Sequence, residues 1–292
     1  MNYAEQLSEY AAAASSADVA AEVARIRSLA ARNENRDVWA ACLGAIDLTT
    51  LSVTDSDRWV TEFAGRAARF AIDFPHLPSP ASVCVYPAFV DVAGLALGAS
   101  RIAITSVAGG FPSSQTFIEV KMLEAAMAVE SGADEVDVVI SVGELLDGEY
   151  DRMVGTLSLL REEVGEETVL KVIVESGALR EPETIRRASL LAMMAGVDFV
   201  KTSTGKIDVA ATPEAAVVMC TAIRDYYERT GRMVGFKAAG GVRTPQDASL
   251  YYTIVEEILG AEWLSPAFFR IGASGLANNL LTAIEGREIS YF

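Results

Sequence analysis

The chain has 292 residues, of which 51% are hydrophobic and 22% charged, and this composition excludes a disordered, collagen-like or disulfide-stapled protein. The 40 Asp and Glu residues against 24 Lys and Arg residues give a formal net charge of −16, so the surface repels phosphate backbones and nucleic-acid binding is not expected. No apolar run reaches the roughly 18 residues that a membrane span needs, and the N-terminus lacks the pattern of a signal peptide.

Residues 1–40 are predicted to form a helical extension at the N-terminus. Val19, Val23 and Ile26 recur at the spacing of one helix face. Ser15 precedes this face and has the hydroxyl group that an N-cap position requires.

Residues 41–292 are expected to form one domain, because short β-branched runs alternate with helical patterns and no low-complexity linker divides them. Eight strands are predicted, at 42–48, 82–87, 101–107, 135–141, 169–175, 197–203, 233–238 and 268–273. Thr212-Pro213 and Thr244-Pro245 each place a capping residue before a proline, as at the start of a helix. Eight strand–helix units in about 250 residues indicate an α/β fold, a (β/α)8 TIM barrel. A doubly wound open sheet is disfavoured because the G-x-G-x-x-G turn is absent.

The rarest residue types exclude several kinds of catalytic site. His76 is the only histidine, so a zinc site built from two or three histidines is not expected, and no metal is predicted. A Ser-His-Asp triad would have to use His76, and no G-x-S-x-G turn is present. The three cysteines, Cys42, Cys84 and Cys220, are odd in number and far apart, which favours reduced thiols and a cytoplasmic location.

Four charged residues interrupt strands that should be apolar. They are Asp137, Lys171, Lys201 and Lys237, in a chain that has only five lysines. In a barrel, a mid-strand charge that does not face the helices faces the interior, where an unpaired charge is very unfavourable. A buried salt-bridge network would account for one such lysine. Lysines on three consecutive strands favour a catalytic function over that purely structural interpretation.

Two lysines in one interior alter each other's chemistry. Two ammonium groups about 6 Å apart repel each other by roughly 3 kcal/mol at an effective dielectric near 20. This repulsion corresponds to about two pKa units and would bring one lysine from about 10.4 towards 8. An amine that is free near neutral pH attacks a carbonyl and forms a Schiff base, while Asp137 and the other lysine move protons. On spacing alone, Lys201 and Lys237 both remain candidates for the nucleophile.

Three glycine-rich turns follow the last three predicted strands, at what would be one end of the barrel. They are Thr202-Ser203-Thr204-Gly205-Lys206, Gly240-Gly241-Val242-Arg243 and Gly272-Ala273-Ser274-Gly275. Glycine lets backbone N–H groups approach an anion, and the loops after the seventh and eighth strands are the usual phosphate site of a barrel. Taken singly, each turn could contain glycine only because the backbone bends tightly there. Together they predict a site for a substrate phosphate, with Lys206 or Arg243 adding positive charge.

Other residues at the strand ends carry weaker indications. Asp47 is expected to have a structural role, through a loop backbone or Thr50, rather than to touch the substrate. Cys84 is interpreted as a small buried hydrophobic residue. Glu175 closes the fifth strand and is expected to pair with an interior lysine. The loop 109–112 is expected to border the site.

Seven motifs occur in order between about Ile46 and Leu281. They are IDLTTL (46–51), CVYP (84–87), ADEVDVV (133–139), LKVIVESGAL (170–179), DFVKTSTGK (198–206), GFKAAGGVR (235–243) and RIGAS (270–274). Together they resemble the 2-deoxyribose-5-phosphate aldolase family of class I, Schiff-base aldolases. DFVKTSTGK is the most specific of them.

The resemblance implies reversible cleavage of 2-deoxyribose 5-phosphate to acetaldehyde and glyceraldehyde 3-phosphate, with no metal or organic cofactor. It implies that Lys201 is the Schiff-base lysine, that Lys237 lowers its pKa and relays protons, and that Asp137 assists proton transfer. Lys171 would belong to the polar network beside them. The residues implied at the phosphate and substrate end are Gly205, Lys206, Gly240, Gly241, Val242, Arg243, Gly272 and Ser274, with Thr204 and Asp47 in support. The implied partner is a small sugar phosphate, and a homodimer is left open.

The chain departs from the resemblance at three positions. Ala238 stands where relatives often have proline. Gly275 replaces a serine, which removes one hydroxyl from the phosphate end. Tyr291 is penultimate, so a terminal tyrosine that reaches the site is not expected. A Schiff-base aldolase with a different or unphosphorylated acceptor, a non-catalytic sugar-phosphate-binding protein and a pyridoxal-phosphate enzyme remain alternatives.

Overall fold

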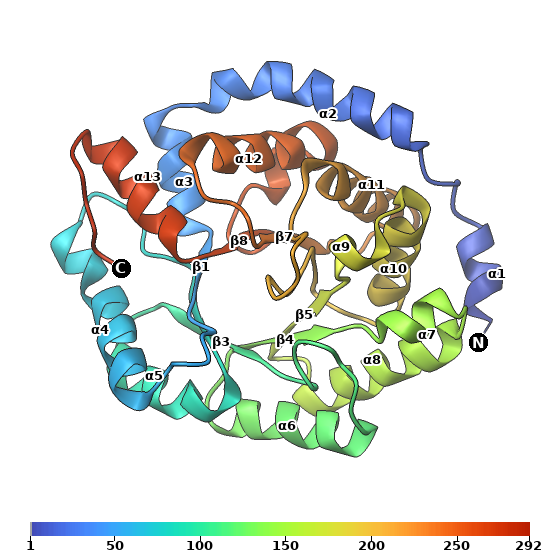
Figure 1. The fold of residues 1–292 in the computed structure, drawn as a ribbon, viewed down its shortest axis with the longest axis horizontal. Coiled ribbons are helices and arrows are strands. Elements are labelled where there is room, and N and C mark those ends of the chain that lie inside the picture. Colours follow the sequence, from blue (N-terminus) through green and yellow to red (C-terminus); the bar gives the residue numbers. More distant parts are fainter. Residues whose placement is uncertain (1) are drawn as a thin grey trace.

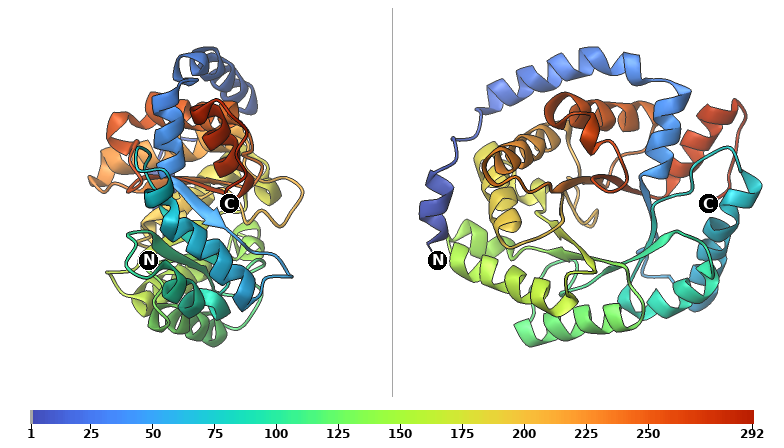
Figure 2. Two further views of the ribbon diagram at one scale, coloured as in Figure 1. Left: turned by 90° about the vertical axis from the view of Figure 1, so that its left-hand side faces the viewer. Right: turned by 180° about the vertical axis from the view of Figure 1, so that it is seen from behind.

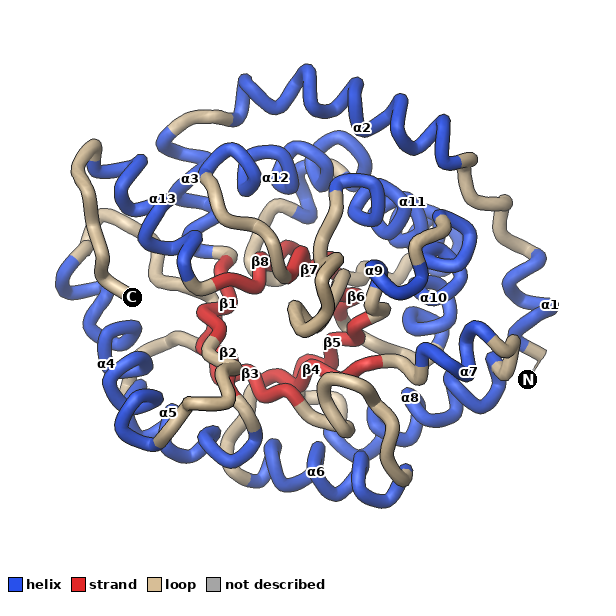
Figure 3. Tube along the Cα trace, in the orientation of Figure 1, coloured by secondary structure: helices blue, strands red, loops and turns tan. Residues whose placement is uncertain are grey.

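The eight predicted strands form one closed barrel in the computed structural model, which describes residues 2–292. Neighbouring strands are parallel and hydrogen-bond in chain order, and β8 closes onto β1 (Figure 3). The strands are β1 (Ile46–Thr49), β2 (Ser82–Val85), β3 (Ala103–Val107), β4 (Glu135–Val139), β5 (Val169–Ile173), β6 (Phe199–Lys201), β7 (Gly235–Ala239) and β8 (Phe269–Ala273). The prediction of a (β/α)8 barrel is confirmed.

A ring of helices covers the outside of the barrel (Figure 1), as the crossover between parallel strands requires. The α-helices are α1 (Tyr3–Ser8), α2 (Ser16–Ala30), α3 (Arg36–Gly44), α4 (Asp57–Asp73), α5 (Val90–Leu97), α6 (Ile118–Glu130), α7 (Val142–Leu146), α8 (Tyr150–Val164), α9 (Ser176–Leu179), α10 (Pro182–Met194), α11 (Pro213–Thr230), α12 (Pro245–Leu259) and α13 (Gly275–Glu285). Three 3-10 helices are η1 (Ala31–Asn33), η2 (Pro87–Phe89) and η3 (Ala261–Trp263). In the part of the chain that the structure describes, no helix has both the length and the apolar character needed to cross a membrane.

Two of the ring helices begin as the sequence predicts. α11 begins at Pro213, and the Thr212 hydroxyl accepts a hydrogen bond from an N–H of the first turn. α12 begins at Pro245, and Thr244 and Asp247 form a capping box. These side chains satisfy N–H groups that the first turn of a helix leaves without partners.

The predicted start of the first strand is wrong. Residues 42–44 form the last turn of α3, and β1 begins only at Ile46. Asn35 caps α3 by accepting hydrogen bonds from two N–H groups, and the helix then buries Val38 and Cys42 on one face. The helical period therefore takes up these apolar residues before the strand begins.

The N-terminal segment lies outside the ring of helices (Figures 1 and 2). α2 packs against α11 and α12, and α1 contacts α8 and α10. Ser15 caps α2 as predicted, and the buried face of this helix carries Val19 and Ile26. α3 crosses the predicted boundary at residue 40 and packs against α12 and α13. The division of the chain at residue 40 stays a prediction.

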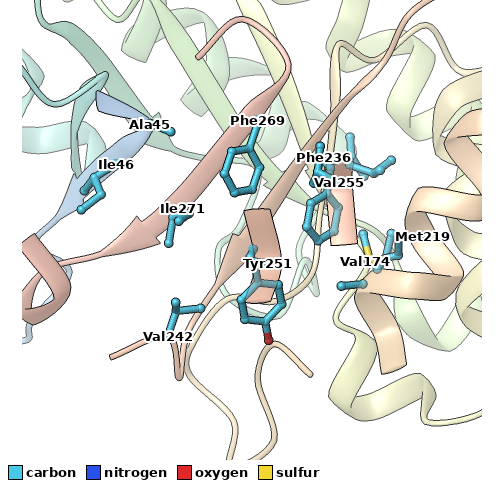
Figure 4. Packing of buried hydrophobic residues seen from close by; sticks show 14 of the residues in the cluster. Ala45, Ile46, Val174, Met219, Phe236, Val242, Tyr251, Val255, Phe269 and Ile271 are labelled. Carbon is cyan, nitrogen blue, oxygen red and sulfur yellow. The ribbon is translucent and has the colours of Figure 1, made fainter. Parts of the chain in front are cut away.

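Side chains along each strand alternate between the helix layer and the barrel interior. Figure 4 shows the outer layer, in which Phe236 of β7 and Phe269 of β8 lie with Tyr251 and Val255 of α12. Lys237 follows Phe236 and therefore points the opposite way, into the barrel. This alternation brings charged residues from several strands to one place.

Candidate active site

The barrel interior holds the four charged residues that the sequence places in mid-strand. They are Asp137 on β4, Lys171 on β5, Lys201 on β6 and Lys237 on β7. Each is buried, with no more than 3% of its surface exposed. The strand register sets Asp137 beside Lys171 and Lys201 beside Lys237. The prediction that these residues face the interior is confirmed.

Asp137 connects the three lysines. Its Oδ1 accepts a hydrogen bond from Lys171 at 3.0 Å, and its Oδ2 accepts one from Lys201 and one from Lys237, each at 2.8 Å. Burial alone would raise the pKa of Asp137, but the three lysines outweigh it and hold the pKa well below its usual range. Asp137 is therefore ionised at neutral pH. The buried salt-bridge network is present, and it includes the residues proposed for catalysis.

Asp47, Glu135 and Arg270 complete the network. Asp47 pairs with Lys237 and, at 2.6 Å, with Arg270. Glu135 pairs with Lys171 and, at 2.7 Å, with Arg270. These contacts give Asp47 structural partners other than Thr50, whose hydroxyl donates to Asp55 instead. Among residues 2–292, no group of three or more His, Cys, Asp and Glu side chains is arranged to hold a metal ion.

Glu135 and Arg270 are site residues that the sequence analysis missed. Both lie in strands, on β4 and β8, and both are buried. Like Asp137, each is a charged residue inside an otherwise apolar strand. Residue 135 shares a strand face with Asp137, so it enters the same interior.

The pKa values of Lys201 and Lys237 are displaced in opposite directions. Burial lowers the pKa of Lys201, and the charge of Lys237 lowers it further, although Asp137 opposes both effects. Burial also disfavours the charged form of Lys237, but Asp137 and Asp47 outweigh it and raise the pKa of Lys237. The interior network contains three carboxylates and four cations, so the loss of one proton balances it. Lys201 is the amine that most readily gives up this proton.

A cavity of about 510 Å³ opens beside Lys201 at the carboxyl end of the strands. The predicted residues that line it are Thr204, Gly205, Lys206, Gly240, Gly241, Val242, Arg243, Gly272 and Ser274. Ala273 and Gly275, from the predicted turn after β8, also line it. The lining residues that were not predicted are Thr49, Leu51, Ala239, Leu276 and Asn279. Of the four charged residues in mid-strand, Lys201 is the one that lines the cavity, so its amine is within reach of a small molecule.

The glycine-rich end of this cavity has the features of an anion site. Gly205 and Gly240 have φ values of +72° and +78°, and a Cβ on Gly240 would lie 3.2 Å from the Cα of Gly205, so glycine lets the two loops approach. α13 begins at Gly275, and no side chain in the described part of the chain caps it. An anion bound in the cavity would therefore meet the first N–H groups of α13, at the positive end of the helix dipole. Arg243 lines the same end.

Glu175 holds the loop between β6 and α11 (Figure 3) instead of pairing with a lysine, so that prediction is wrong. Its carboxylate accepts hydrogen bonds from the N–H and the hydroxyl of Thr204, at 3.2 and 2.6 Å. Glu175 has φ and ψ of +56° and +57°, a left-handed conformation that takes its side chain out of the strand alternation. Lys206 also holds this loop, because its Nζ donates to the carbonyl of Leu51.

The weaker predictions at the edge of the site have clear outcomes. Cys84 is buried with Leu51, as expected for a small hydrophobic residue. Phe111, from the loop 109–112, packs against the same cluster, but no residue of this loop lines the cavity that Leu51 lines. The hydroxyl of Tyr291 donates to Asp73 on α4, so it is engaged away from the site, as expected.

The chain is similar to known proteins in both sequence and structure. A family model described as DeoC/LacD family aldolase matches residues 42–278. The deoxyribose-phosphate aldolase of Mus musculus is 41% identical over 277 residues, covering 89% of this chain and 86% of the mouse protein. The deoxyribose-phosphate aldolase of Homo sapiens is 40% identical over 272 residues, covering 88% of this chain and 85% of the human protein. The fold is similar to that of the tetrameric deoxyribose phosphate aldolase from Aeropyrum pernix, with a TM-score of 0.65, 24% identity and coverage of 88% and 96% of the two chains.

Proposed function

This chain belongs to the DeoC/LacD family of aldolases, and on that premise we propose that it reversibly cleaves 2-deoxyribose 5-phosphate to acetaldehyde and glyceraldehyde 3-phosphate. The proposed chemistry is that of a class I aldolase, in which a lysine forms a Schiff base without a metal or an organic cofactor. One observation carries the proposal. A lysine with a lowered pKa lines a cavity whose other end has the features of an anion site.

Lys201 is the proposed nucleophile. Its neutral amine attacks the C1 aldehyde of the open-chain sugar, and loss of water gives the imine. The imine draws electrons from the C2–C3 bond, which breaks as the C3 hydroxyl loses its proton and glyceraldehyde 3-phosphate leaves. The remaining enamine is protonated at C2, and water then hydrolyses the imine to acetaldehyde and free Lys201.

Asp137 is proposed to transfer protons in these steps, and Lys237 is proposed to control the protonation state of Lys201. Asp137 is ionised and its Oδ2 lies 2.8 Å from both amines, so it can take a proton as Lys201 becomes neutral. Lys237 keeps its charge, which favours the neutral form of Lys201 and stabilises negative charge that develops nearby. Lys171 and Asp47 are proposed to position Asp137 and Lys237 through the contacts described above.

The substrate phosphate is proposed to lie at the glycine-rich end of the cavity. The residues proposed to hold it are Gly205, Lys206, Gly240, Gly241, Val242, Arg243, Gly272 and Ser274, with Thr204 in support. Backbone N–H groups and the start of α13 supply most of the donors, and Arg243 supplies charge. Such local capture is required because the chain as a whole has a net charge of −16.

The activity is tested by following the cleavage of 2-deoxyribose 5-phosphate by NMR, with 2-deoxyribose in a parallel reaction. Both acetaldehyde and glyceraldehyde 3-phosphate are expected, with kcat/KM at least ~10-fold higher for the phosphate ester, as for a ligand that gains charge-assisted hydrogen bonds. Gly275 favours a second candidate, an aldolase with an unphosphorylated acceptor, because it removes a hydroxyl from the phosphate end. Equal values for the two sugars would support that candidate, and no cleavage of either would contradict both.

The proposal also includes a homodimer located in the cytoplasm. All three cysteines are free and buried, which suits a reducing compartment. One chain has a mass of 31.1 kDa. Light scattering on the purified protein is expected to give twice that mass, and the mass of one chain would contradict the dimer.

A further inference from the structure

The carboxyl end of the barrel has a second polar cavity that the aldolase chemistry does not use. Its volume is about 590 Å³, and it is lined by the loop that leads from β3 into α6, by Lys121 of α6, by Ser141 and the start of α7, and by Arg152 of α8. In the closed barrel, β3 and β4 lie across from β7 and β8, whose loops line the first cavity. Loops at the carboxyl end are where barrels of this type carry their binding sites.

Lys121 of α6 lies at this cavity without a counter-charge. Only 4% of it is exposed, and its Nζ donates to the hydroxyl of Ser114 at 2.8 Å and to that of Ser141 at 3.5 Å. Within residues 2–292, it forms no ion pair with a carboxylate. Burial lowers the pKa of Lys121, although the charge of Glu144 opposes this effect in part. The positive charge of Lys121 is therefore uncompensated at this cavity, and a bound anion would balance it.

Ser114 and Ser141 add donors beside this ammonium. Each hydroxyl accepts a hydrogen bond from Lys121, which leaves its own O–H to donate. Ser114 is buried and has φ of +59°, a left-handed conformation that residues other than glycine seldom adopt. Such strain persists only where the surroundings impose it, and it is concentrated at ligand sites. The ammonium and the two hydroxyls form a cluster of donors suited to an oxyanion.

Glu144 and Arg152 line the same cavity and pair with each other, which leaves one carboxylate oxygen of Glu144 without a hydrogen-bond donor. Glu144 Oε1 pairs with the Nε of Arg152 at 2.9 Å, so this carboxylate already has a cation and does not neutralise Lys121. Glu144 Oε2 is buried and accepts no hydrogen bond from any residue that the structure describes. A buried acceptor of this kind calls for a donor, such as a hydroxyl group.

From this arrangement we propose a second binding site, for a small phosphate monoester that also carries a hydroxyl group. Its phosphoryl oxygens accept hydrogen bonds from Lys121, Ser114 and Ser141, and its hydroxyl donates to Glu144. The cavity volume falls within the range of about 300–1,000 Å³ that small-molecule sites have. Inorganic phosphate offers the same oxyanion chemistry without the hydroxyl. The site is separate from the aldolase centre, so its occupant need not be the aldolase substrate.

The test uses calorimetric titration of the purified chain in a background that removes the first phosphate site. Ser274→Asp places a carboxylate at the start of α13 for this purpose. Glycerol 3-phosphate and inorganic phosphate are titrated separately into this variant. One site per chain is expected, and it is expected to weaken on the order of tenfold or more when Lys121→Met or Ser141→Asp is added. Tighter binding of glycerol 3-phosphate assigns the site to an organic monoester, and equal or tighter binding of phosphate assigns it to the free ion.

Two features keep this test decisive. Ser141→Asp supplies Lys121 with an internal carboxylate and leaves the lysine in place, so it separates loss of the site from loss of packing. Ser131→Asp, at the far end of α6, adds the same charge away from the cavity and is expected to change nothing. Aldolase activity of the Lys121→Met chain is expected to stay near that of the unmodified protein. Absence of binding in the Ser274→Asp background, or binding that neither Lys121→Met nor Ser141→Asp weakens, would overturn the proposal.

Discussion

Lys201 and Lys237 donate hydrogen bonds to the same atom, Oδ2 of Asp137, each at 2.8 Å. This shared acceptor explains how one amine can be neutral inside a charged network. When Lys201 gives up its proton, Asp137 keeps Lys237 and Lys171 as partners, so no buried charge is left alone. Lys201 lines the cavity, and the amine that can be neutral is therefore the one that a substrate can reach.

Replacement of Lys237 by leucine is expected to raise the pKa of Lys201, because the change removes a nearby positive charge. At neutral pH a smaller fraction of Lys201 is then neutral, and kcat/KM falls by roughly 10- to 100-fold, with its ascending limb shifted to higher pH. The pH dependence of kcat/KM measures this shift. Lys237→Arg keeps the charge and is the matched control, and an unshifted profile in Lys237→Leu would refute the role given to Lys237.

Replacement of Asp137 by asparagine is expected to lower both activity and stability. Three buried ammonium groups lose their common carboxylate, a loss of about 3–5 kcal/mol in the free energy of unfolding for a broken buried pair. The folded pKa of Asp137 is below its unfolded value, so its stabilising contribution is complete above about pH 4 and is lost as the pH falls through the folded pKa. Urea unfolding at pH 7 and pH 3 should show a smaller difference between the two chains in acid. A difference that grows in acid would contradict this assignment.

Replacement of Glu175 by glutamine is expected to loosen the loop that carries Thr204. The carboxylate accepts two hydrogen bonds from Thr204, and an amide side chain cannot accept both equally well. KM for the phosphorylated sugar should rise roughly tenfold while kcat/KM for 2-deoxyribose changes little. Steady-state kinetics with both sugars make the comparison, and Glu181→Gln on the adjacent surface serves as the control. An equal loss with both sugars would show that Glu175 acts on the whole site rather than on the phosphate loop.

Replacement of Gly275 by serine is expected to strengthen phosphate binding. A Cβ at this position would have no neighbouring atom within 4 Å, so the added hydroxyl fits without displacing the backbone. One additional hydrogen bond, worth about 1 kcal/mol, would lower KM for the phosphorylated sugar about fivefold. Kinetics with 2-deoxyribose should be unaffected. An unchanged KM would place the phosphate away from the start of α13.

Much of the interior could be predicted from the sequence, because strand side chains alternate and a charge is conspicuous in an apolar strand. Asp137, Lys171 and Lys237 follow from this rule alone. Glu135 and Arg270 obey the same rule and lie inside the predicted strands 135–141 and 268–273, so the rule could have identified them as well. Their pairing with each other could not be predicted, because it depends on how strands that are distant in the chain meet across the barrel.

The contacts of the loops could not be predicted in the same way. Glu175 would face an interior lysine if the strand continued through it, and only its left-handed backbone directs it to Thr204. The second cavity was also not predicted, since Lys121 lies within an ordinary helical pattern. The absence of a carboxylate partner for Lys121 depends on how α6 packs beside the segment that follows β4.

The central claim is that Lys201 forms the imine, and borohydride trapping with acetaldehyde tests it most directly. Reduction of the imine fixes an ethyl group on the reacting lysine, which peptide mass mapping then locates. The account predicts the ethyl group on Lys201 and no trapping in a folded Lys201→Ala chain. An ethyl group on Lys237 would reverse the two roles, and no label on either lysine would contradict the Schiff-base mechanism.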